Sequence, residues 1–272
     1  MKLTVPAYQK SDIWYPESPD SDRRADSTWS EVARKNPIRA AAATGDSDPF
    51  AKYPEWVRPY FLDRPGTVLD GGCGYGRVSI PLLKANPNLR CIGVDASPVM
   101  LEKFVELAKE RGVADRVELF CGNLDKLPFP DSSFEFVLSC AVLLHVPKRD
   151  VKGIIREFNR VLSNHGTLIL QGAFPNAFNP EGILNIRNNF REEKNGPVRA
   201  YTRSEVKRLF TYFTNVTVEA HQMIVLPRSI GPVPMPFANV ARRLNRFCTI
   251  HLMKAFKHSG FMVNHHDVVA MK

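Results

Sequence analysis

Apolar and polar positions form regular blocks from Thr67 onward, and the spacing of the apolar residues changes from block to block. Short apolar runs rich in β-branched and aromatic residues predict strands. Longer segments between them carry apolar residues three or four positions apart, which is typical of amphipathic helices. Residues 149–162 are a clear case, with such residues at Val151, Ile154, Ile155, Phe158 and Val161. Alternating strands and helices predict a parallel sheet with helices on both faces, hence an α/β doubly wound fold.

The predicted strands are residues 67–70, 89–95, 116–121, 134–139, 166–171, 216–224 and 261–271. The predicted helices are residues 98–111, 149–162, 202–212 and 237–257, with shorter ones at 27–35 and 49–62. One further helix is predicted to open at Tyr75 or Gly76, directly after the first strand. Residues 1–25 are polar and contain proline, so they are predicted to be irregular, and residues 227–236 form a Pro-rich linker.

This pattern predicts one large domain with additions. The domain is expected to cover residues 63–272 and to contain two insertions, at 172–201 and 225–260, where the strand–helix rhythm breaks. Residues 1–62 precede it as an irregular segment with short helices. Together with the insertions, this N-terminal segment is expected to form a lid.

Composition places the chain among globular proteins. No apolar run approaches the ~18–20 residues that a membrane span needs, and the first residues lack the features of a signal peptide. Five cysteines are odd in number and show no C-x-x-C spacing, which favours a reducing compartment over disulfide pairing. A cytoplasmic location is therefore expected, with membrane association left open by the basic helix discussed next.

Positive charge gathers near the C-terminal end. Lys and Arg exceed Asp and Glu by 37 − 28 = 9. From Leu226 onward the only acidic residue is Asp267, so this part carries most of the excess. An anionic partner is one explanation, and a solvated basic face is the other. This part of the chain contains the predicted helix 237–257, whose apolar side carries Val240, Leu244, Phe247 and Ile250.

Three interpretations of the basic amphipathic helix 237–257 stay open. It can pack as a cap on the domain, cover an active site as a lid, or lie on an anionic membrane or lipid-linked substrate. Nucleic acid is disfavoured, because the chain has no recognisable RNA-binding module and no stacking platform of aromatic and basic residues.

The segment from Thr67 to Arg77 reads TVLDGGCGYGR and carries the strongest chemical signal in the chain. A strand runs into a glycine-rich turn, and a helix is predicted to follow. Glycines let backbone N–H groups approach a ligand closely, and a helix N-terminus adds partial positive charge. The segment therefore predicts a nucleotide-type pocket.

Spacing distinguishes two kinds of ligand. A dinucleotide-binding turn has the pattern G-x-G-x-x-G, whose third glycine would fall at position 77, where this chain has Arg77. The observed pattern is D-x-G-x-G-x-G, from Asp70 through Gly72 and Gly74 to Gly76. It resembles the first motif of class I S-adenosylmethionine (SAM)-dependent methyltransferases.

Two later segments extend the resemblance. IGVDAS ends the second strand with Asp95, ~20 residues beyond the glycine turn, where doubly wound folds place an acid on the ribose hydroxyls; capping of the next helix is the alternative role. CGNLDKLPF, followed by a Phe-led strand, is similar to the family's third motif, with Asn123 where Asp is usual. The resemblance covers residues 66–171 and is to enzymes that methylate quinones, sterols, sugars and other metabolites.

The resemblance implies SAM as cofactor, strand order 3-2-1-4-5-7-6 in a seven-stranded sheet, and a set of cofactor-binding residues. The glycines would line the methionine part with support from Asp70, while Asn123 and Leu124 would contact adenine. Met100 would either contact adenine or pack in the core. The full set is Asp70, Gly71, Gly72, Gly74, Gly76, Asp95, Ala96, Met100, Asn123, Leu124 and Ser139.

His145 is the candidate catalytic residue. It lies near the end of SCAVLLHV (residues 139–146), a loop that borders the transferred methyl group in the family that this chain resembles, and a histidine there can accept a hydroxyl proton near neutral pH. A purely structural histidine is the alternative. O-methylation of a small or lipid-linked hydroxyl compound is the leading hypothesis. An RNA methyltransferase using the basic end and a SAM-binding module without catalysis are its rivals.

Other chemistries find less support in the sequence. The [N/D]-P-P-[Y/F] stretch typical of amino-nitrogen methylation of bases or glutamine is absent, and Cys140 follows Ser139 rather than the proline of a cytosine methyltransferase. His265, His266 and Asp267 are adjacent, so on a strand they point to opposite faces and do not converge on a metal. No metal site is predicted.

Overall fold

The computed structural model describes residues 2–17, 30–31, 34, 57–61, 63–187, 200–227, 229–230, 233–234 and 236–272. Its contacts divide the chain into two compact units. Unit one comprises Met1–Cys140, Arg156–Leu168 and Lys272, and unit two comprises Ala141–Ile155 and Ile169–Met271. Each unit is described on its own below.

The described strands form a nine-stranded sheet and a separate two-stranded one. Strand order in the larger sheet is β1-β2-β5-β4-β3-β6-β7-β11-β8. Without β1 and β2, this order is the expected 3-2-1-4-5-7-6, which confirms the doubly wound α/β class; the expected number of seven strands is wrong. The strands of the larger sheet are β1 Ala7–Lys10, β2 Ile13–Pro16, β3 Gly66–Gly71, β4 Leu89–Asp95, β5 Val117–Cys121, β6 Phe134–Cys140, β7 Leu162–Pro175, β8 Asn215–Glu219 and β11 His265–Met271.

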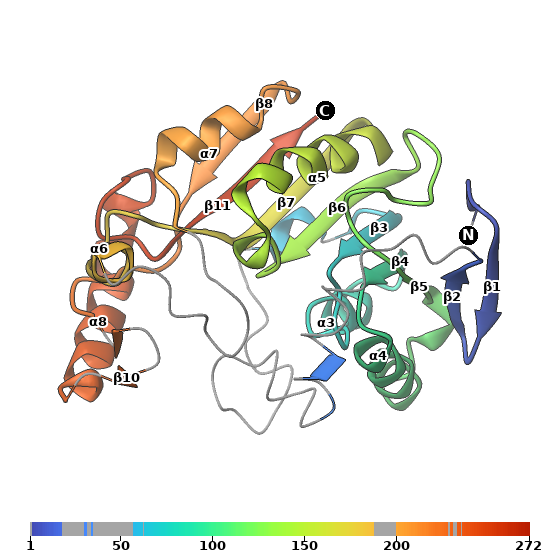
Figure 1. Cartoon of the computed structure of the whole chain (residues 1–272), viewed down its shortest axis with the longest axis horizontal. Helices are drawn as coiled ribbons and strands as arrows, with labels where there is room; N and C mark the ends of the chain where they lie inside the picture. The colour runs from blue at the N-terminus through green and yellow to red at the C-terminus, as the bar shows by residue number, and fades with distance from the viewer. Residues whose placement is uncertain are drawn as a thin grey trace. The chain divides into compact units, whose positions relative to one another are not determined.

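The centre of unit one is β3, which pairs in parallel with β4 on one side and β6 on the other. Leu69 lies opposite Ile92 and Val137 in these pairings. Four of the six residues of β3 are buried. A central parallel strand is covered on both faces, which explains the apolar run at Val68 and Leu69. Helices α3 (Ser79–Ala85) and α4 (Pro98–Glu110) pack against β4 and β5 (Figure 1).

The N-terminal segment contains the two extra strands. β1 and β2 form an antiparallel hairpin whose two-residue turn, Ser11 and Asp12, has φ of 51° and 65°. β2 then pairs in parallel with β5, and Ile13 is fully buried. The prediction that residues 1–25 are irregular is therefore wrong for both strands. The turn has the two positive φ angles of a type I′ hairpin without the Asn-Gly or Asp-Gly pair that usually marks one.

Most predicted helix and strand boundaries agree with the structure to within a few residues. The clearest shift is α3, which begins at Ser79 and not at Tyr75 or Gly76. Gly76 has φ of 81°, outside the helical region, so the turn continues through Val78. Of the predicted helix 27–35, Ser30, Glu31 and Arg34 are helical and the other residues lie outside the described ones. Of the predicted helix 49–62, residues 49–56 and 62 lie outside them, and Arg58–Tyr60 is a short 3₁₀ helix, η1.

Unit two contains the antiparallel pair β8 and β11 and most of the C-terminal helices. α7 begins with a capping box, in which Thr202 and Glu205 bond reciprocally. The remaining elements of the described chain are η2 Ala114–Arg116, η3 Leu143–His145, α5 Lys148–Val161, α6 Pro180–Arg187, α7 Arg203–Leu209, β9 Ser229–Ile230, β10 Val233–Pro234 and α8 Ala238–Phe256. None of the helices in the described part of the chain is long and apolar enough to cross a membrane.

Candidate cofactor-binding site

The glycine turn after β3 has a backbone that only glycine adopts readily. Gly72, Gly74 and Gly76 have φ of 77°, 53° and 81°. A Cβ at Gly76 would lie 2.4 Å from the Phe104 ring, so this glycine faces the core. A Cβ at Gly74 would meet no atom within 4 Å, so here the turn presents bare backbone to open space. Such a cradle suits close approach of a ligand to main-chain atoms.

Asp95 joins the glycine turn to the end of β4. Its Oδ2 accepts the N–H of Gly74 at 2.8 Å, and its Oδ1 accepts the N–H of Ser97 at 2.9 Å. Ser97 itself caps α4, since its Oγ accepts the N–H of Met100 at 3.4 Å. Asp95 is therefore not the N-cap. A carboxylate can accept hydrogen bonds from two neighbouring hydroxyls, and contact of Asp95 with the ribose stays a prediction.

Asp70 lies beneath the turn and is buried. Its Oδ2 accepts a hydrogen bond from Ser79 Oγ at 2.5 Å, which links the end of β3 to the first residue of α3. Burial raises the pKa of Asp70 to about 7, and the nearby Asp95 carboxylate adds to the shift. The environment makes Asp70 a support for the turn.

Gly71, Leu124 and Ser139 meet at the end of β3. Ser139 Oγ donates to Gly71 O at 2.6 Å. A Cβ at Gly71 would lie 3.0 Å from the Phe158 ring and 3.4 Å from Leu124. The N–H of Gly122 donates to Asp95 O at 3.0 Å, which brings the loop carrying Asn123 and Leu124 beside the end of β4.

The structure thus brings the glycines, Asp70, Asp95, Leu124 and Ser139 together in unit one at the carboxyl ends of parallel strands, where open α/β sheets bind ligands. Met100 lies on the buried side of α4, 3% exposed, and Ala96 is half-buried in the loop after β4. Contact of these two residues, and of Asn123, with a cofactor stays a prediction.

Sequence reasoning missed three contributors to this region. Ser79 holds Asp70, as described above. Arg77 follows the last glycine and places its guanidinium 3.5 Å from Cys140 Sγ, at the end of β6. Ser30, from the N-terminal segment, lies 2.9 Å from Ser97, oxygen to oxygen. Only Arg77 had a local signal, because a charged residue occupies the position where a dinucleotide turn needs glycine.

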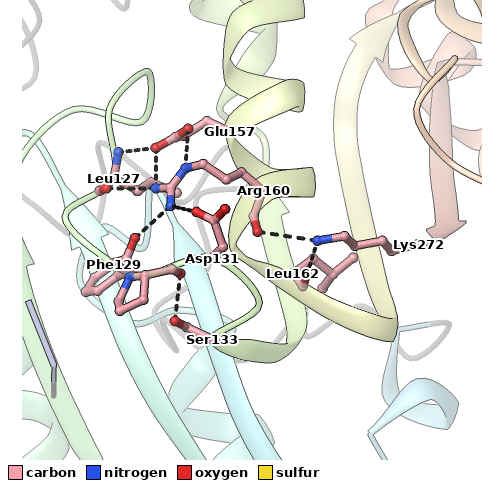
Figure 2. Close-up of polar contacts among 9 residues, drawn as sticks. Leu127, Phe129, Asp131, Ser133, Glu157, Arg160, Leu162 and Lys272 are labelled. Atoms are coloured by element: carbon pink, nitrogen blue, oxygen red, sulfur yellow. Dashed lines mark hydrogen bonds and ion pairs between the residues drawn. The ribbon is translucent and has the colours of Figure 1, made fainter. Parts of the chain in front are cut away.

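Arg160 fixes the loop that follows Asn123 and Leu124 (Figure 2). Its guanidinium donates to the carbonyls of Leu127 and Phe129 at 3.1 and 2.8 Å, and to Asp131 and Glu157, both at 2.7 Å. These carboxylates raise the pKa of Arg160 further above its ordinary value. The L-P-F loop of the third motif is therefore tied to α5.

Lys272 completes the same network. Its Nζ donates to the carbonyls of Leu162 at 2.7 Å and Arg160 at 3.4 Å, where α5 ends (Figure 2). A cation at a helix C-terminus satisfies unpaired carbonyls and complements the helix dipole.

His145 belongs to unit two and ends the 3₁₀ helix η3. Its backbone N–H donates to Val142 O at 2.9 Å, and its side chain is half-buried. The preceding Ala141 has φ of 57°, so the chain turns sharply after β6 before it reaches His145. The catalytic role of His145 stays a prediction.

Unit two also contains a buried acid beside two histidines. Asp267 accepts the N–H of Gly172 at 2.6 Å, and its Oδ2 lies 3.9 Å from His221 Nε2. Burial raises the pKa of Asp267 to about 7 and lowers that of His221. His266 is fully buried, and no cluster of three metal-ligating side chains occurs among the described residues.

Comparison with known proteins identifies the domain. Residues 68–166 match a family described as "Methyltransferase domain". Among curated proteins, an ajmaline N-methyltransferase of Rauvolfia serpentina is 30% identical over 121 residues, covering 44% of this chain and 39% of that protein. A 27-O-demethylrifamycin SV methyltransferase of Amycolatopsis mediterranei is 33% identical over 138 residues, covering 51% of this chain and 49% of that protein. The chain thus spans less than half of the length of these relatives.

Solved structures agree on the fold. The YcgJ protein of Bacillus subtilis superposes with a TM-score of 0.54 at 22% identity, covering 80% of this chain and 97% of that one. The match to the methyltransferase-domain family, residues 68–166, begins within β3 and includes the glycine turn, Asp95 and the L-P-F loop. Residues 68–166 therefore match a methyltransferase domain, and the fold agrees with the class I SAM-dependent methyltransferase fold that the sequence motifs predict, with SAM as the cofactor that this resemblance implies.

Proposed function

We propose that this protein transfers the methyl group of SAM to a hydroxyl oxygen on a small-molecule or lipid-linked acceptor. The observation that carries the proposal is that the open glycine turn is hydrogen-bonded to Asp95. It offers bare backbone at Gly74 and, beside it at the end of β4, the Asp95 carboxylate, whose Oδ2 accepts the Gly74 N–H at 2.8 Å.

Different residues would bind different parts of SAM. Gly72, Gly74 and Gly76 would hold the methionine part, with Asp70 and Ser79 keeping the turn in shape. Asp95 would hold the ribose, and Asn123 with Leu124 the adenine. SAM supplies an activated sulfonium methyl, so the protein chiefly has to align donor and acceptor at ~3–3.5 Å and exclude water.

Oxygen is the proposed acceptor atom because a hydroxyl gains from a base, and His145 is the candidate for that base. The names of the relatives leave the atom open, since one is an N-methyltransferase and another acts on an O-demethylated compound. The absence of an [N/D]-P-P-[Y/F] stretch counts against methylation of amino nitrogens on bases or glutamine.

Calorimetric titration with SAM and S-adenosylhomocysteine tests the cofactor site. Both should bind in the micromolar range and NADH should not, because Arg77 replaces the third glycine of a dinucleotide turn. Asp95→Ala should weaken SAM binding by at least about tenfold, since a charged hydrogen bond contributes ~1.5–3 kcal/mol. The exposed carboxylate Asp115→Ala is the matched control. Equal binding by both variants would refute the ribose role.

Methyl transfer from labelled SAM to a panel of hydroxylated metabolites and lipids tests the reaction. His145→Ala should lower turnover ~10²–10⁴-fold while leaving the Kd for SAM unchanged, because a base acts in the transition state. His165→Asn, at an exposed histidine, controls for general effects. Unchanged turnover would show that His145 is not a base, and salt-sensitive methylation of RNA would replace the proposed acceptor class.

A further inference from the structure

Helix α8 is held in unit two by a face of small and polar residues. Ala238, Ala241, Asn245 and Cys248 are its buried residues. Asn245 Oδ1 accepts the N–H groups of Val225 and Leu226 at 2.9 and 3.1 Å, and its Nδ2 donates to Leu226 O at 2.9 Å. These directional bonds fix which side of the helix faces the rest of the unit.

A second bond repeats the anchor one turn further on. Thr249 Oγ1 accepts the N–H of Met223 at 2.9 Å. Beyond the helix, Lys257 O accepts the N–H of Ala220 at 2.8 Å, and its Nζ bonds Glu219 at 3.1 Å. The helix is therefore anchored along its length.

The opposite face carries the large apolar side chains. Val240, Leu244 and Phe247 follow one another at helical spacing and are 62%, 39% and 57% exposed, and Ile250 beside them is 63% exposed. A surface helix normally buries its large apolar residues and exposes polar ones. Here the arrangement is inverted, and the outer stripe of Val240, Leu244, Phe247 and Ile250 lies open to solvent.

Basic residues accompany the outer stripe. Arg243 and Arg246 are exposed and stand four positions before Phe247 and Ile250, so they project on the same side of the helix. Arg242 and Lys254 add to the charge, and the 19-residue helix contains no Asp or Glu. Exposed apolar side chains interleaved with arginines are typical of a helix lying in the interface of an anionic membrane.

We propose that α8 binds peripherally to an anionic lipid bilayer, with its outer stripe inserted among the acyl chains and its arginines on the lipid phosphates. The helix is ~28 Å long and cannot span a membrane, so it would lie in the membrane plane. The inference goes beyond the proposed function, because it holds whether or not the chain transfers methyl groups.

Charge distinguishes the bilayer from other occupants. A symmetric pairing of two copies of the chain would set the same arginines against one another. Nucleic acid would use the arginines but leave Phe247 and Ile250 in water, because phosphates gain nothing from aliphatic contact. Only an anionic apolar surface satisfies both halves of the pattern.

Vesicle flotation with the full chain tests the proposal. The protein should float with vesicles of phosphatidylcholine mixed with phosphatidylglycerol, and much less with phosphatidylcholine alone or at high salt. Phe247→Ser with Ile250→Ser should weaken binding at least about tenfold, since it removes two inserted side chains. Tyr8→Ser, at a residue 51% exposed in β1, is the matched apolar control.

A charge pair completes the test. Arg243→Glu with Arg246→Glu should also weaken binding to the anionic vesicles by at least about tenfold. Lys84→Glu with Arg149→Glu makes the same change of net charge at exposed sites outside α8 and should bind nearly as the parent does. Failure to float, or equal flotation of parent and stripe variants, would overturn the proposal. So would a dimer in solution that the stripe variants convert to monomer without any vesicle binding.

Discussion

Helices α5 and α8 carry the same sequence signal, apolar residues at helical spacing with basic residues among them, and they use it in opposite ways. In α5 every residue of the predicted stripe is buried, namely Val151, Ile154, Ile155, Phe158 and Val161. In α8 every residue of the predicted stripe is exposed. Periodicity therefore predicts a helix and an apolar face, while the surface that this face meets is decided by tertiary packing.

The two helices differ in the residues that they bury against the rest of the protein. Phe158 of α5 packs against Gly71 at the end of β3, in a space that the missing Cβ leaves open. α8 instead buries alanines and the carboxamide of Asn245, whose bonds to Val225 and Leu226 are specific in direction. A polar anchor with three hydrogen bonds outweighs the preference of the larger apolar side for burial, because an unsatisfied buried amide is costly.

The largest expected effect comes from truncating one aromatic residue in each helix. Phe158→Ala should lower the free energy of unfolding by ~3–5 kcal/mol, because it removes a fully buried ring and leaves a cavity. Phe247→Ala should change it by no more than ~1 kcal/mol, since Phe247 is 57% exposed and buries little area. Urea denaturation of the two variants measures the difference. Similar losses in both would mean that the outer stripe is covered in solution.

Burial gives His266 a different effect on stability from that of the exposed His251, and the pH dependence of stability measures this difference. His266 on β11 is fully buried, which lowers its pKa to about 4. Its two ring nitrogens have no hydrogen-bond partner in the described part of the chain. The folded state therefore binds fewer protons than the unfolded state between pH 4 and 6.5, so stability from this group is lost as pH falls through that range.

The corresponding variant is His266→Phe. The parent should gain ~3 kcal/mol of unfolding free energy from pH 4 to 6.5 through this group, and the variant should lack that contribution. Urea titrations at several pH values measure the slope, with His251→Phe on the exposed side of α8 as control. An unchanged slope in His266→Phe would show that another group carries the pH dependence.

Arg160 in α5 and Arg246 in α8 are expected to contribute differently to stability. Arg160→Met should cost ~1–3 kcal/mol, because Leu127 O and Phe129 O lose their donor and Glu157 loses its partner. The estimate stays modest since the side chain is 31% exposed. Arg246→Met on α8 should lie within ~0.5 kcal/mol of the parent. Thermal unfolding of both variants is the measurement, and equal shifts would contradict a role for Arg160 in holding the loop.

Sequence patterns predicted most of the sheet of this protein and the position of its cofactor turn, because both depend on local chemistry. Alternating apolar blocks define β3 to β6, and glycine spacing defines the turn. The hairpin of β1 and β2 was missed since its turn uses Ser11 and Asp12, which carry no strong turn signal. Most of the Arg160 network was missed because Leu127, Phe129 and Asp131 lie 29 to 33 residues away along the chain, beyond any local pattern.

The smallest expected effect is the most informative about α8. Val240→Ser with Leu244→Ser removes half of the outer stripe while leaving the Asn245 anchor untouched. If that stripe meets nothing beyond its own unit in the isolated protein, the unfolding free energy should stay within ~1 kcal/mol of the parent, because Val240 and Leu244 are 62% and 39% exposed and little buried apolar area is lost. Circular dichroism during urea unfolding measures this. A loss above ~2 kcal/mol would require the two side chains to be buried against something in solution, and α8 would then resemble α5 after all.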